Sequence, residues 1–191
     1  MAKFYTELDE ALRDFIGRQR MFFHASAPNQ GRINLSPKGL DTFRVLSDKR
    51  VAYLDLTGSE CETAAHLAEN GRLTLMFCSF EDKPLILRLY GRGWVVRPRD
   101  ARWGELRPLF PPVPGERQVV GLDIESIMTT CGFAVPVYEF KGQRQLLPEF
   151  TCKLGEQKMD EYRRRRNQVS IDGLPTYLFE DAPRSGTGEA P

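Results

Sequence analysis

Alternation of apolar and polar residues along much of the chain predicts a protein built mainly of β-strands. Segment 50–57, RVAYLDLT, is representative, because Ala52 and Leu54 fall on one face while Val51 and Tyr53 fall on the other. Six further segments are expected to form strands: 21–27, 32–36, 72–80, 85–96, 117–130 and 132–140. Most of them follow one another through hairpin-length turns, which favours an antiparallel barrel or sandwich over a doubly wound parallel sheet.

Apolar residues spaced three and four apart predict short helices between these strands. The clearest is 58–71, where Ser59 is expected to be the N-cap, Glu62 completes a capping box, and Asn70-Gly71 ends the helix. Three other helices are expected: one capped by Thr6 and carrying Leu8, Leu12, Phe15 and Ile16, one over 100–110 capped by Asp100, and a charged one that starts after residue 151 and ends near Asn167.

Composition narrows the classes of protein that remain. The chain has 191 residues, 41% of them hydrophobic, and a net charge of +1, which gives no overall attraction to nucleic acid or to an anionic membrane. The Arg163–Arg166 run follows two acidic residues and is interpreted as a solvated helix end. Four scattered cysteines and two histidines favour neither a zinc site nor a disulfide framework. We therefore expect a soluble cytoplasmic protein with no signal peptide and no membrane span.

A change in composition near residue 150 predicts the domain organisation. Residues 1–150 are expected to form one domain, and 151–182, which are charged with sparse apolar residues, a C-terminal helical extension. The last stretch, 183–191, has the composition of a disordered tail.

The stretch GRINLSPKGLD, residues 31–41, suggests a binding site at the point where a strand runs into a turn. Asn34, Ser36 and Lys38 share one strand face, and Pro37-Gly39 turns the chain away. This pattern also occurs in turns without any ligand. A nearby helix start, DLTGSECET (55–63), offers unpaired amides and hydroxyls, which together favour an anion such as a phosphate.

Arg88 lies in the middle of a predicted strand, where a guanidinium needs a partner. A phosphate would be such a partner.

The order MFFHASA, INLSPKG, VAYLDLTG, ETAAHLAENGRLTLMF and LILRLYGRG resembles the pyridoxamine 5'-phosphate oxidase-like family of FMN-binding split barrels, over roughly residues 10–140. The resemblance implies an antiparallel split β-barrel with short helices, FMN as cofactor, and a homodimer with the flavin site at its interface. It also implies hydride or electron transfer between the flavin and a small-molecule substrate or a nicotinamide donor. By position, these residues would contact FMN: Asn34, Leu35, Ser36 and Lys38 along the flavin, Leu56, Thr57 and Thr63 at its ribityl-phosphate end, and Arg88 from the neighbouring strand.

The sequence departs from the family pattern at two places. Glu62 and Thr63 stand where family members often have basic residues, and no tryptophan follows Trp103, although the true oxidases have one in a C-terminal segment. We therefore expect a relative that does not oxidise pyridoxamine phosphate and whose substrate is open. A non-catalytic flavin or haem binder on the same barrel and a deazaflavin-dependent reductase are the alternatives.

Three other residues could have a chemical role. Cys131 is either a small buried residue beside a strand bend or a thiol near the flavin ring. His24 could face the site or the dimer interface, and His66 is expected to be a partly exposed helix residue.

Overall fold

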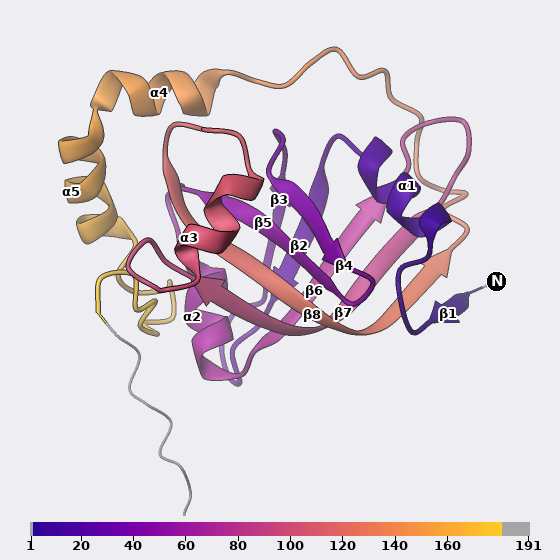
Figure 1. The fold of residues 1–191 in the computed structure, drawn as a ribbon, viewed down its shortest axis with the longest axis horizontal. Helices are drawn as coiled ribbons and strands as arrows, with labels where there is room; N and C mark the ends of the chain where they lie inside the picture. The colour runs from indigo at the N-terminus through magenta and orange to yellow at the C-terminus, as the bar shows by residue number, and fades with distance from the viewer. Residues whose placement is uncertain (1, 181–191) are drawn as a thin grey trace, which may run out of the picture.

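The computed structural model describes residues 2–180 and contains an eight-stranded antiparallel sheet. The strands are β1 (Lys3–Tyr5), β2 (Phe22–Ser26), β3 (Asn34–Lys38), β4 (Phe43–Ser47), β5 (Arg50–Leu56), β6 (Arg72–Cys78), β7 (Ile86–Val96) and β8 (Glu116–Thr130). Their order across the sheet is β3-β2-β6-β7-β8-β5-β4, with β1 paired to β8 (Figure 1).

The sheet has to curve because its two edge strands are neighbours in sequence. β3 and β4 stand at opposite ends of the strand order, yet only residues 39–42 connect them. Four residues span at most about 14 Å, so the two edges must approach each other. The result is the split barrel that the sequence predicts, with β8, which pairs with both β5 and β7, as its longest strand.

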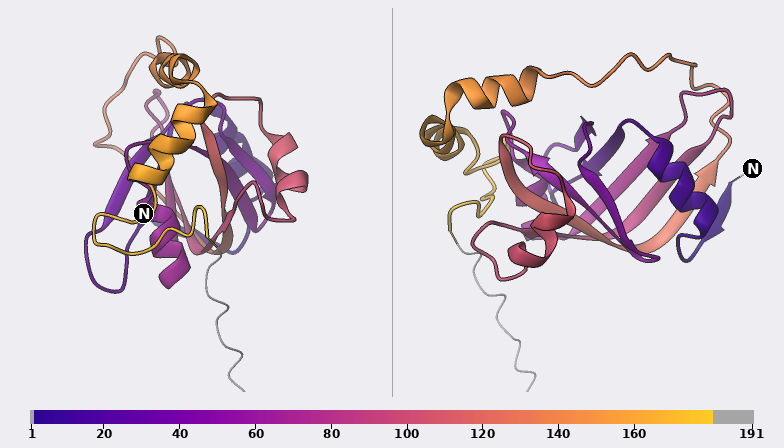
Figure 2. Two further views of the ribbon diagram at one scale, coloured as in Figure 1. Left: turned by 90° about the vertical axis from the view of Figure 1, so that its left-hand side faces the viewer. Right: turned by 45° about the horizontal axis from the view of Figure 1, so that its top comes forward.

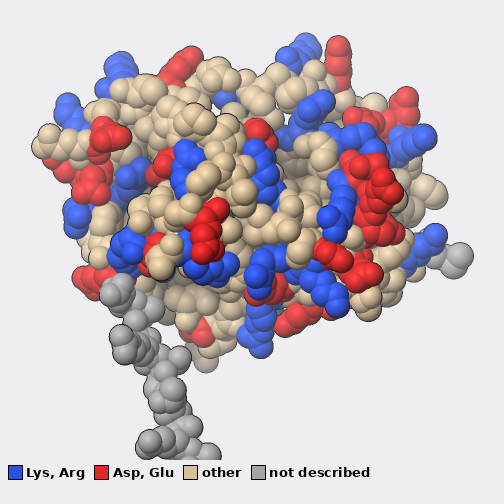
Figure 3. Space-filling view, in the orientation of Figure 1, with Lys and Arg blue, Asp and Glu red and all other residues tan. Residues whose placement is uncertain are grey.

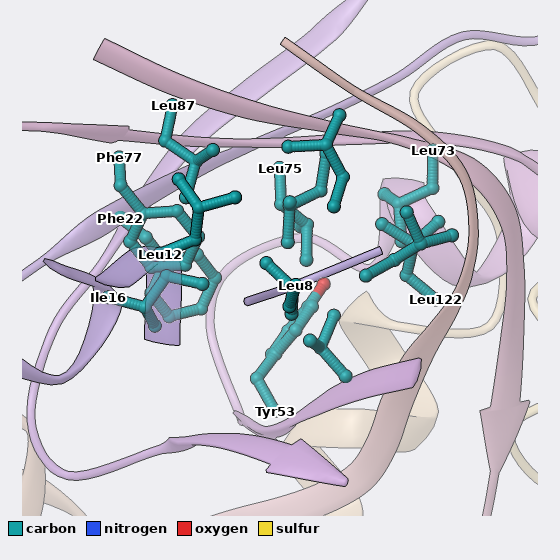
Figure 4. Close-up of a cluster of buried hydrophobic side chains, with 14 of the residues drawn as sticks. Leu8, Leu12, Ile16, Phe22, Tyr53, Leu73, Leu75, Phe77, Leu87 and Leu122 are labelled. Carbon is teal, nitrogen blue, oxygen red and sulfur yellow. The ribbon is translucent and has the colours of Figure 1, made fainter. Parts of the chain in front are cut away.

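The main core fills the barrel and is closed at one end by α1 (Glu10–Arg18). Leu12 and Ile16 of α1 are buried with Phe22, Phe77 and other strand residues (Figure 4). The apolar stripe of this helix was predicted, but its N-cap is Asp9, whose carboxylate accepts the Leu12 amide at 2.8 Å, and not Thr6.

A second apolar cluster lies under α3 (Trp103–Leu106) and the 3-10 turn η1 (Arg107–Leu109). The expected helix over 100–110 is thus much shorter. Asp100 does not cap it, because its side chain accepts the Arg97 amide in the preceding turn. Pro108 has no amide hydrogen, which is consistent with the early change to a 3-10 turn.

The chain after β8 differs most from expectation. Segment 132–140, predicted to be a strand, is an irregular connection that starts at Gly132 with a positive φ of 68° and contains Pro136. It passes along one side of the barrel to α4 (Leu146–Leu154) and α5 (Glu156–Arg166) (Figures 1 and 2). The single helix expected there is broken at Gly155, where φ is 77°.

Two short strands, β1 and β4, were not predicted. The expected domain boundary at residue 150 falls inside α4, and the predicted tail at 183–191 lies outside the described residues. Lysine, arginine and acidic side chains are interspersed over the face seen in Figure 3, without a broad field of one sign.

Candidate functional site

Strand β3 presents three polar side chains to the barrel interior. Asn34, Ser36 and Lys38 are partly buried, whereas Leu35 and Pro37 between them are exposed on the opposite face. Antiparallel pairing with β2 then sets these polar residues beside other inward-facing groups. The spacing in GRINLSPKGLD therefore places the three side chains as predicted.

These side chains meet the start of α2 (Glu62–Glu69) around a small polar chamber of about 40 Å³. The walls include Asn34, Ser36 and Lys38 from β3 and residues 60–64 at the helix start. A volume of this size accommodates one or a few water-sized groups. The chamber thus brings together the lysine and the helix N-terminus that the sequence analysis paired.

A chain of hydrogen bonds links β3 to α2 and to the core. The Ser36 hydroxyl donates to Asn34 Oδ1 at 2.9 Å, and Asn34 Nδ2 donates to Thr63 Oγ1 at 3.0 Å. Thr63 Oγ1 lies 3.2 Å from His24 Nδ1, which also lies 2.7 Å from the Tyr53 hydroxyl. The relative positions of β3 and the helix start are therefore fixed by side chains as well as by the sheet.

The charged centre of the chamber is Asp55 on β5. Its carboxylate accepts from Lys38 Nζ at 2.9 Å, Arg117 Nη2 at 2.7 Å and Gln118 Nε2 at 2.9 Å. Burial alone would raise the pKa of Asp55, but Arg117 and Lys38 together hold this pKa well below its ordinary value. The Asp55 carboxylate thus faces two cations, while Glu60 and Glu62 also line the chamber.

Two buried polar atoms at the chamber have no hydrogen-bond partner among the described residues. They are His24 Nε2 and Gln118 Oε1, and both residues line the chamber. Burial, and then Lys38, lower the pKa of His24 to about 3, so the imidazole is neutral at physiological pH. An unpaired buried polar group is costly, so the chamber suits a polar occupant.

The loop between β5 and α2 is held by β8 and by the C-terminal segment. Arg163 Nε donates to Thr57 Oγ1 at 2.8 Å, and Asn167 Nδ2 donates to the Gly58 carbonyl at 3.2 Å. Arg117 Nη1 donates to the Glu60 carbonyl at 2.9 Å and to Asn167 Oδ1 at the same distance. The loop conformation therefore depends on residues that are distant in the sequence.

The capping box predicted for α2 is wrong. The helix begins at Glu62, its N-cap is Cys61 without a side-chain bond, and Ser59 is exposed in the loop. The Glu62 carboxylate instead accepts the backbone amide of Ile171 at 2.9 Å. Because the C-terminal segment engages Glu62, this carboxylate does not point freely at the helix amides.

A larger cavity of about 630 Å³ adjoins the chamber and shares Lys38 with it. Its walls include Leu54, Leu56, Thr57 and Gly58. Further lining residues come from the connection to α4 and from the start of α4, namely Phe140, Gly142, Gln143, Arg144, Leu146 and Leu147. The volume lies within the range of small-molecule sites.

The structure places the eight predicted site residues in three groups. Asn34, Ser36, Lys38 and Thr63 line the chamber, and Lys38, Leu56 and Thr57 line the larger cavity. Leu35 is 64% exposed on the outer face of the sheet. Arg88 lies between the fully buried Leu87 and Leu89, so it also points outward, with its Nη1 3.3 Å from Thr130 Oγ1.

Several residues of the site were not predicted. Asp55 and Gln118 are polar residues within largely apolar strands, a signal visible in the sequence, but their pairing follows only from the β5–β8 register. For Arg163 and Asn167 the sequence indicates no more than a solvated helix end. His66, expected to be partly exposed, is fully buried with Nδ1 2.9 Å from Ser26 Oγ, and Cys131 is exposed.

Two kinds of feature are absent from the described part of the chain. Residues 2–180 contain no group of three or more histidine, cysteine or acidic side chains arranged to hold a metal ion. Within the same range, no helix has the length and apolar character needed to cross a bilayer.

The split barrel and its interior polar chamber define the class of protein, and comparisons with known proteins give the family. The profile described as pyridoxamine 5'-phosphate oxidase matches residues 8–131. The chain is 43% identical over 195 residues to the pyridoxamine 5'-phosphate oxidase family protein ustO of Aspergillus flavus, and the alignment covers 92% of this chain and 78% of that protein. The chain therefore belongs to the pyridoxamine 5'-phosphate oxidase family.

Two solved structures share the fold. One, from Lactobacillus delbrueckii, is described as a putative pyridoxamine 5'-phosphate oxidase; it has a TM-score of 0.52 and 20% identity, and the match covers 64% of this chain and 94% of that one. The other, a variant of HupZ from Group A Streptococcus, has a TM-score of 0.50 and 20% identity, with 64% of this chain and 98% of that one covered. At this identity they show the fold alone.

Proposed function

We propose that this protein binds FMN and acts as an FMN-dependent oxidoreductase. The observation that carries the proposal is the pairing of two unlike spaces that share Lys38: a polar chamber lined by Lys38, Arg117 and the start of α2, and a larger, mostly apolar cavity. FMN has the same two parts, a phosphate and a broad apolar ring system. The side chains present therefore fit the cofactor that the family resemblance implies.

The phosphate would be held at the chamber. Lys38 and Arg117 supply positive charge, the hydroxyl of Ser36 supplies a hydrogen-bond donor, and residues 60–64 at the start of α2 line the same space. Charge-assisted hydrogen bonds to phosphate oxygens are worth about 1.5–3 kcal/mol each. Such bonds would offset the cost of burying the anion.

The ring would lie in the larger cavity against Leu54, Leu56 and Leu40. A bound flavin supplies hydride and electron transfer to the reaction. The protein's own contribution would be to bind and orient the cofactor and to exclude water with the segment 140–147. No acidic residue or histidine lines this cavity in the described part of the chain, so we assign no general acid or base there.

We further propose that two copies of the chain form a homodimer. Among the described residues, half of the twelve large apolar side chains that are strongly exposed lie between residues 133 and 150, namely Phe133, Val137, Tyr138, Phe140, Leu146 and Phe150. Leu35 and Arg88 point outward from the sheet, so they could reach a flavin only across a subunit interface. A second copy that covers these surfaces would explain both features.

Purification of the full chain tests the cofactor. We expect a yellow protein whose absorbance spectrum is that of oxidised flavin and whose denatured supernatant contains FMN by mass spectrometry. A released deazaflavin or haem would replace the proposal with one of its rivals. Light scattering of the same sample should give the mass of two chains.

Enzyme and carrier differ in the behaviour of the bound flavin. Anaerobic addition of NADH or NADPH should bleach the flavin spectrum, and an added electron acceptor should restore it repeatedly. A flavin that stays oxidised with both nucleotides and with small organic electron donors would favour a carrier or sensor. A colourless protein that never takes up added FMN would overturn the proposed function.

We infer a cytoplasmic location from the cysteines. All four are free thiols in the structure, two of them exposed, as is common in a reducing compartment.

A further inference from the structure

The charged side chains that line the larger cavity all carry positive charge. Three cationic side chains line it, Arg20, Lys38 and Arg144, and in the described part of the chain no aspartate or glutamate does. The rest of its wall is largely apolar or small, with Leu54 and Leu56 on the inside and Leu146 and Leu147 on the side of α4. A cavity with this lining favours a ligand that has an apolar body and a negative charge.

The three cations are not equivalent. Lys38 is already paired with Asp55 at 2.9 Å and faces the chamber. Arg20 and Arg144 are exposed, and they form no ion pair among the described residues. These two guanidinium groups are therefore available to an anion that approaches from solvent.

The two segments that carry these arginines contact each other. Gln143 Nε2 donates to the Arg20 carbonyl at 2.9 Å, and the Arg20 guanidinium carbon lies 5.4 Å from the centre of the Phe140 ring. These contacts tie the segment that carries Arg144 to the end of α1. Among the described residues, the cavity wall thus presents two guanidinium groups without an acidic partner, from two linked segments.

We propose that Arg20 and Arg144 form a recognition site for the substrate, and that the substrate is a small organic anion, a carboxylate or a phosphate ester, with a largely apolar body. This inference rests on the proposed function, because the flavin ring would occupy the inner part of the same cavity and its phosphate the chamber at Lys38. The guanidinium groups donate to the substrate's anionic oxygens, while the apolar body enters between Leu40 and Leu147 toward the flavin. Neutral analogues of the same shape lack the charge that these arginines recognise.

Matched probes test the charge requirement. Benzoate and benzamide have nearly the same shape but differ in charge, and phenyl phosphate supplies the other anionic group. Binding of each to the FMN-loaded protein is measured by isothermal titration calorimetry, with perturbation of the flavin spectrum as a second readout. We expect benzoate or phenyl phosphate to bind at least about tenfold more tightly than benzamide, which corresponds to about 1.4 kcal/mol.

Charge-removing variants test the two residues. R20Q combined with R144Q should reduce anion affinity about tenfold or more, toward that of benzamide, and leave FMN occupancy unchanged. R18Q combined with K141Q is the control, because these cations are exposed nearby, in α1 and in the 140–147 segment, but do not line the cavity. This control should bind the anions like the wild type.

Equal affinity for benzoate, phenyl phosphate and benzamide would overturn the inference, and so would an R20Q/R144Q protein with unchanged anion binding. A wild-type protein that binds no FMN would instead overturn the proposed function. In that case the same calorimetry on the colourless protein still decides whether the arginines select anions.

Discussion

Lys38 and Asp55 form a largely buried ion pair in which Lys38 Nζ lies 2.9 Å from Asp55 Oδ1. The pair joins the last residue of β3 to the interior of β5, two strands that share no hydrogen bonds in the sheet. Because Arg117 binds the other carboxylate oxygen, Asp55 positions two cations at once. The pair thus holds Lys38 between the chamber and the larger cavity.

Removal of the Lys38 charge should weaken cofactor binding without preventing folding. In K38M, Asp55 keeps Arg117 and Gln118 as partners, so the barrel should fold normally. Loss of one charge-assisted bond should weaken FMN binding by about 10- to 100-fold. Riboflavin has no phosphate, so its affinity should change little. Quenching of flavin fluorescence on titration gives both constants.

The exposed Lys49 offers a matched control for this experiment. K49M removes the same charge away from the site and should bind FMN like the wild type. Equal weakening of FMN and riboflavin in K38M would mean that Lys38 does not contact the phosphate.

Removal of the Asp55 charge should affect stability most. D55N leaves Arg117, which is 4% exposed, without its anionic partner, and breaking a buried pair in this way costs about 3–5 kcal/mol. Urea unfolding followed by circular dichroism should show this loss. D41N is the control, because Asp41 is 69% exposed and its pair with Arg44 is worth less than about 1 kcal/mol. A D55N protein as stable as D41N would contradict this account of the chamber.

Sequence patterns predicted those parts of the fold that depend on local periodicity. The alternation in RVAYLDLT, the stripe of Leu12 and Ile16, and the inward face of β3 all follow from the residues themselves, and the structure has them. β4 was not predicted, although it pairs with β5; it has only five residues, and its burial does not alternate in the structure. Segment 132–140 alternates like a strand but joins no strand of the sheet, and it contains Gly132 with a positive φ and Pro136.

Only part of the candidate site could be predicted from the sequence, and the reason is physical. Lys38 and Ser36 could be placed together because they are two apart on one strand. Asp55 meets Arg117 and Gln118 through a register between β5 and β8, more than sixty residues apart, which no local pattern specifies. The same holds for the contact of Asn167 with Gly58.

Asn167 gives a test of how far the loop between β5 and α2 depends on the C-terminal segment. Its side chain is fully buried, donates to the Gly58 carbonyl and accepts from Arg117. N167A should cost about 1–3 kcal/mol of stability, because the buried Arg117 and the partly buried Gly58 carbonyl each lose a hydrogen bond. It should also weaken FMN binding about tenfold, since the loop at Thr57 would be less ordered.

Gln168 provides the comparison. It is exposed, and its side chain donates to the Arg164 carbonyl within its own helix end. Q168A should therefore match the wild type in urea unfolding and in FMN titration. If N167A behaves like Q168A, the C-terminal segment does not order the loop.

His24 predicts a specific dependence of stability on pH. Burial, then Lys38, lower its pKa from 6.5 to about 3 in the folded protein, although Asp55 partly opposes the shift. Between these two values the unfolded chain binds a proton that the folded chain does not, so acid favours unfolding. Stability should therefore fall as the pH is lowered below about 6.5, with a slope that approaches about 1.4 kcal/mol per pH unit from this residue. Asp55 adds a second loss of stability only at lower pH. Because its pKa is depressed in the folded protein, only the unfolded chain takes up this proton once the pH falls to the ordinary pKa of a carboxyl group.

Urea unfolding at a series of pH values between about 4 and 7 measures this slope. H24Q cannot take up the proton and should lose about 1.4 kcal/mol per pH unit of the dependence, even though it is less stable at neutral pH. Burial also lowers the pKa of His66, so H66Q should flatten the curve in the same direction, and the double variant should be flattest. If the slope of H24Q equals that of the wild type, His24 must have the same pKa in the folded and unfolded chains, so the folded protein would protonate it below about pH 6.5. In that pH range His24 would then add a positive charge at the chamber beside Lys38 and Arg117.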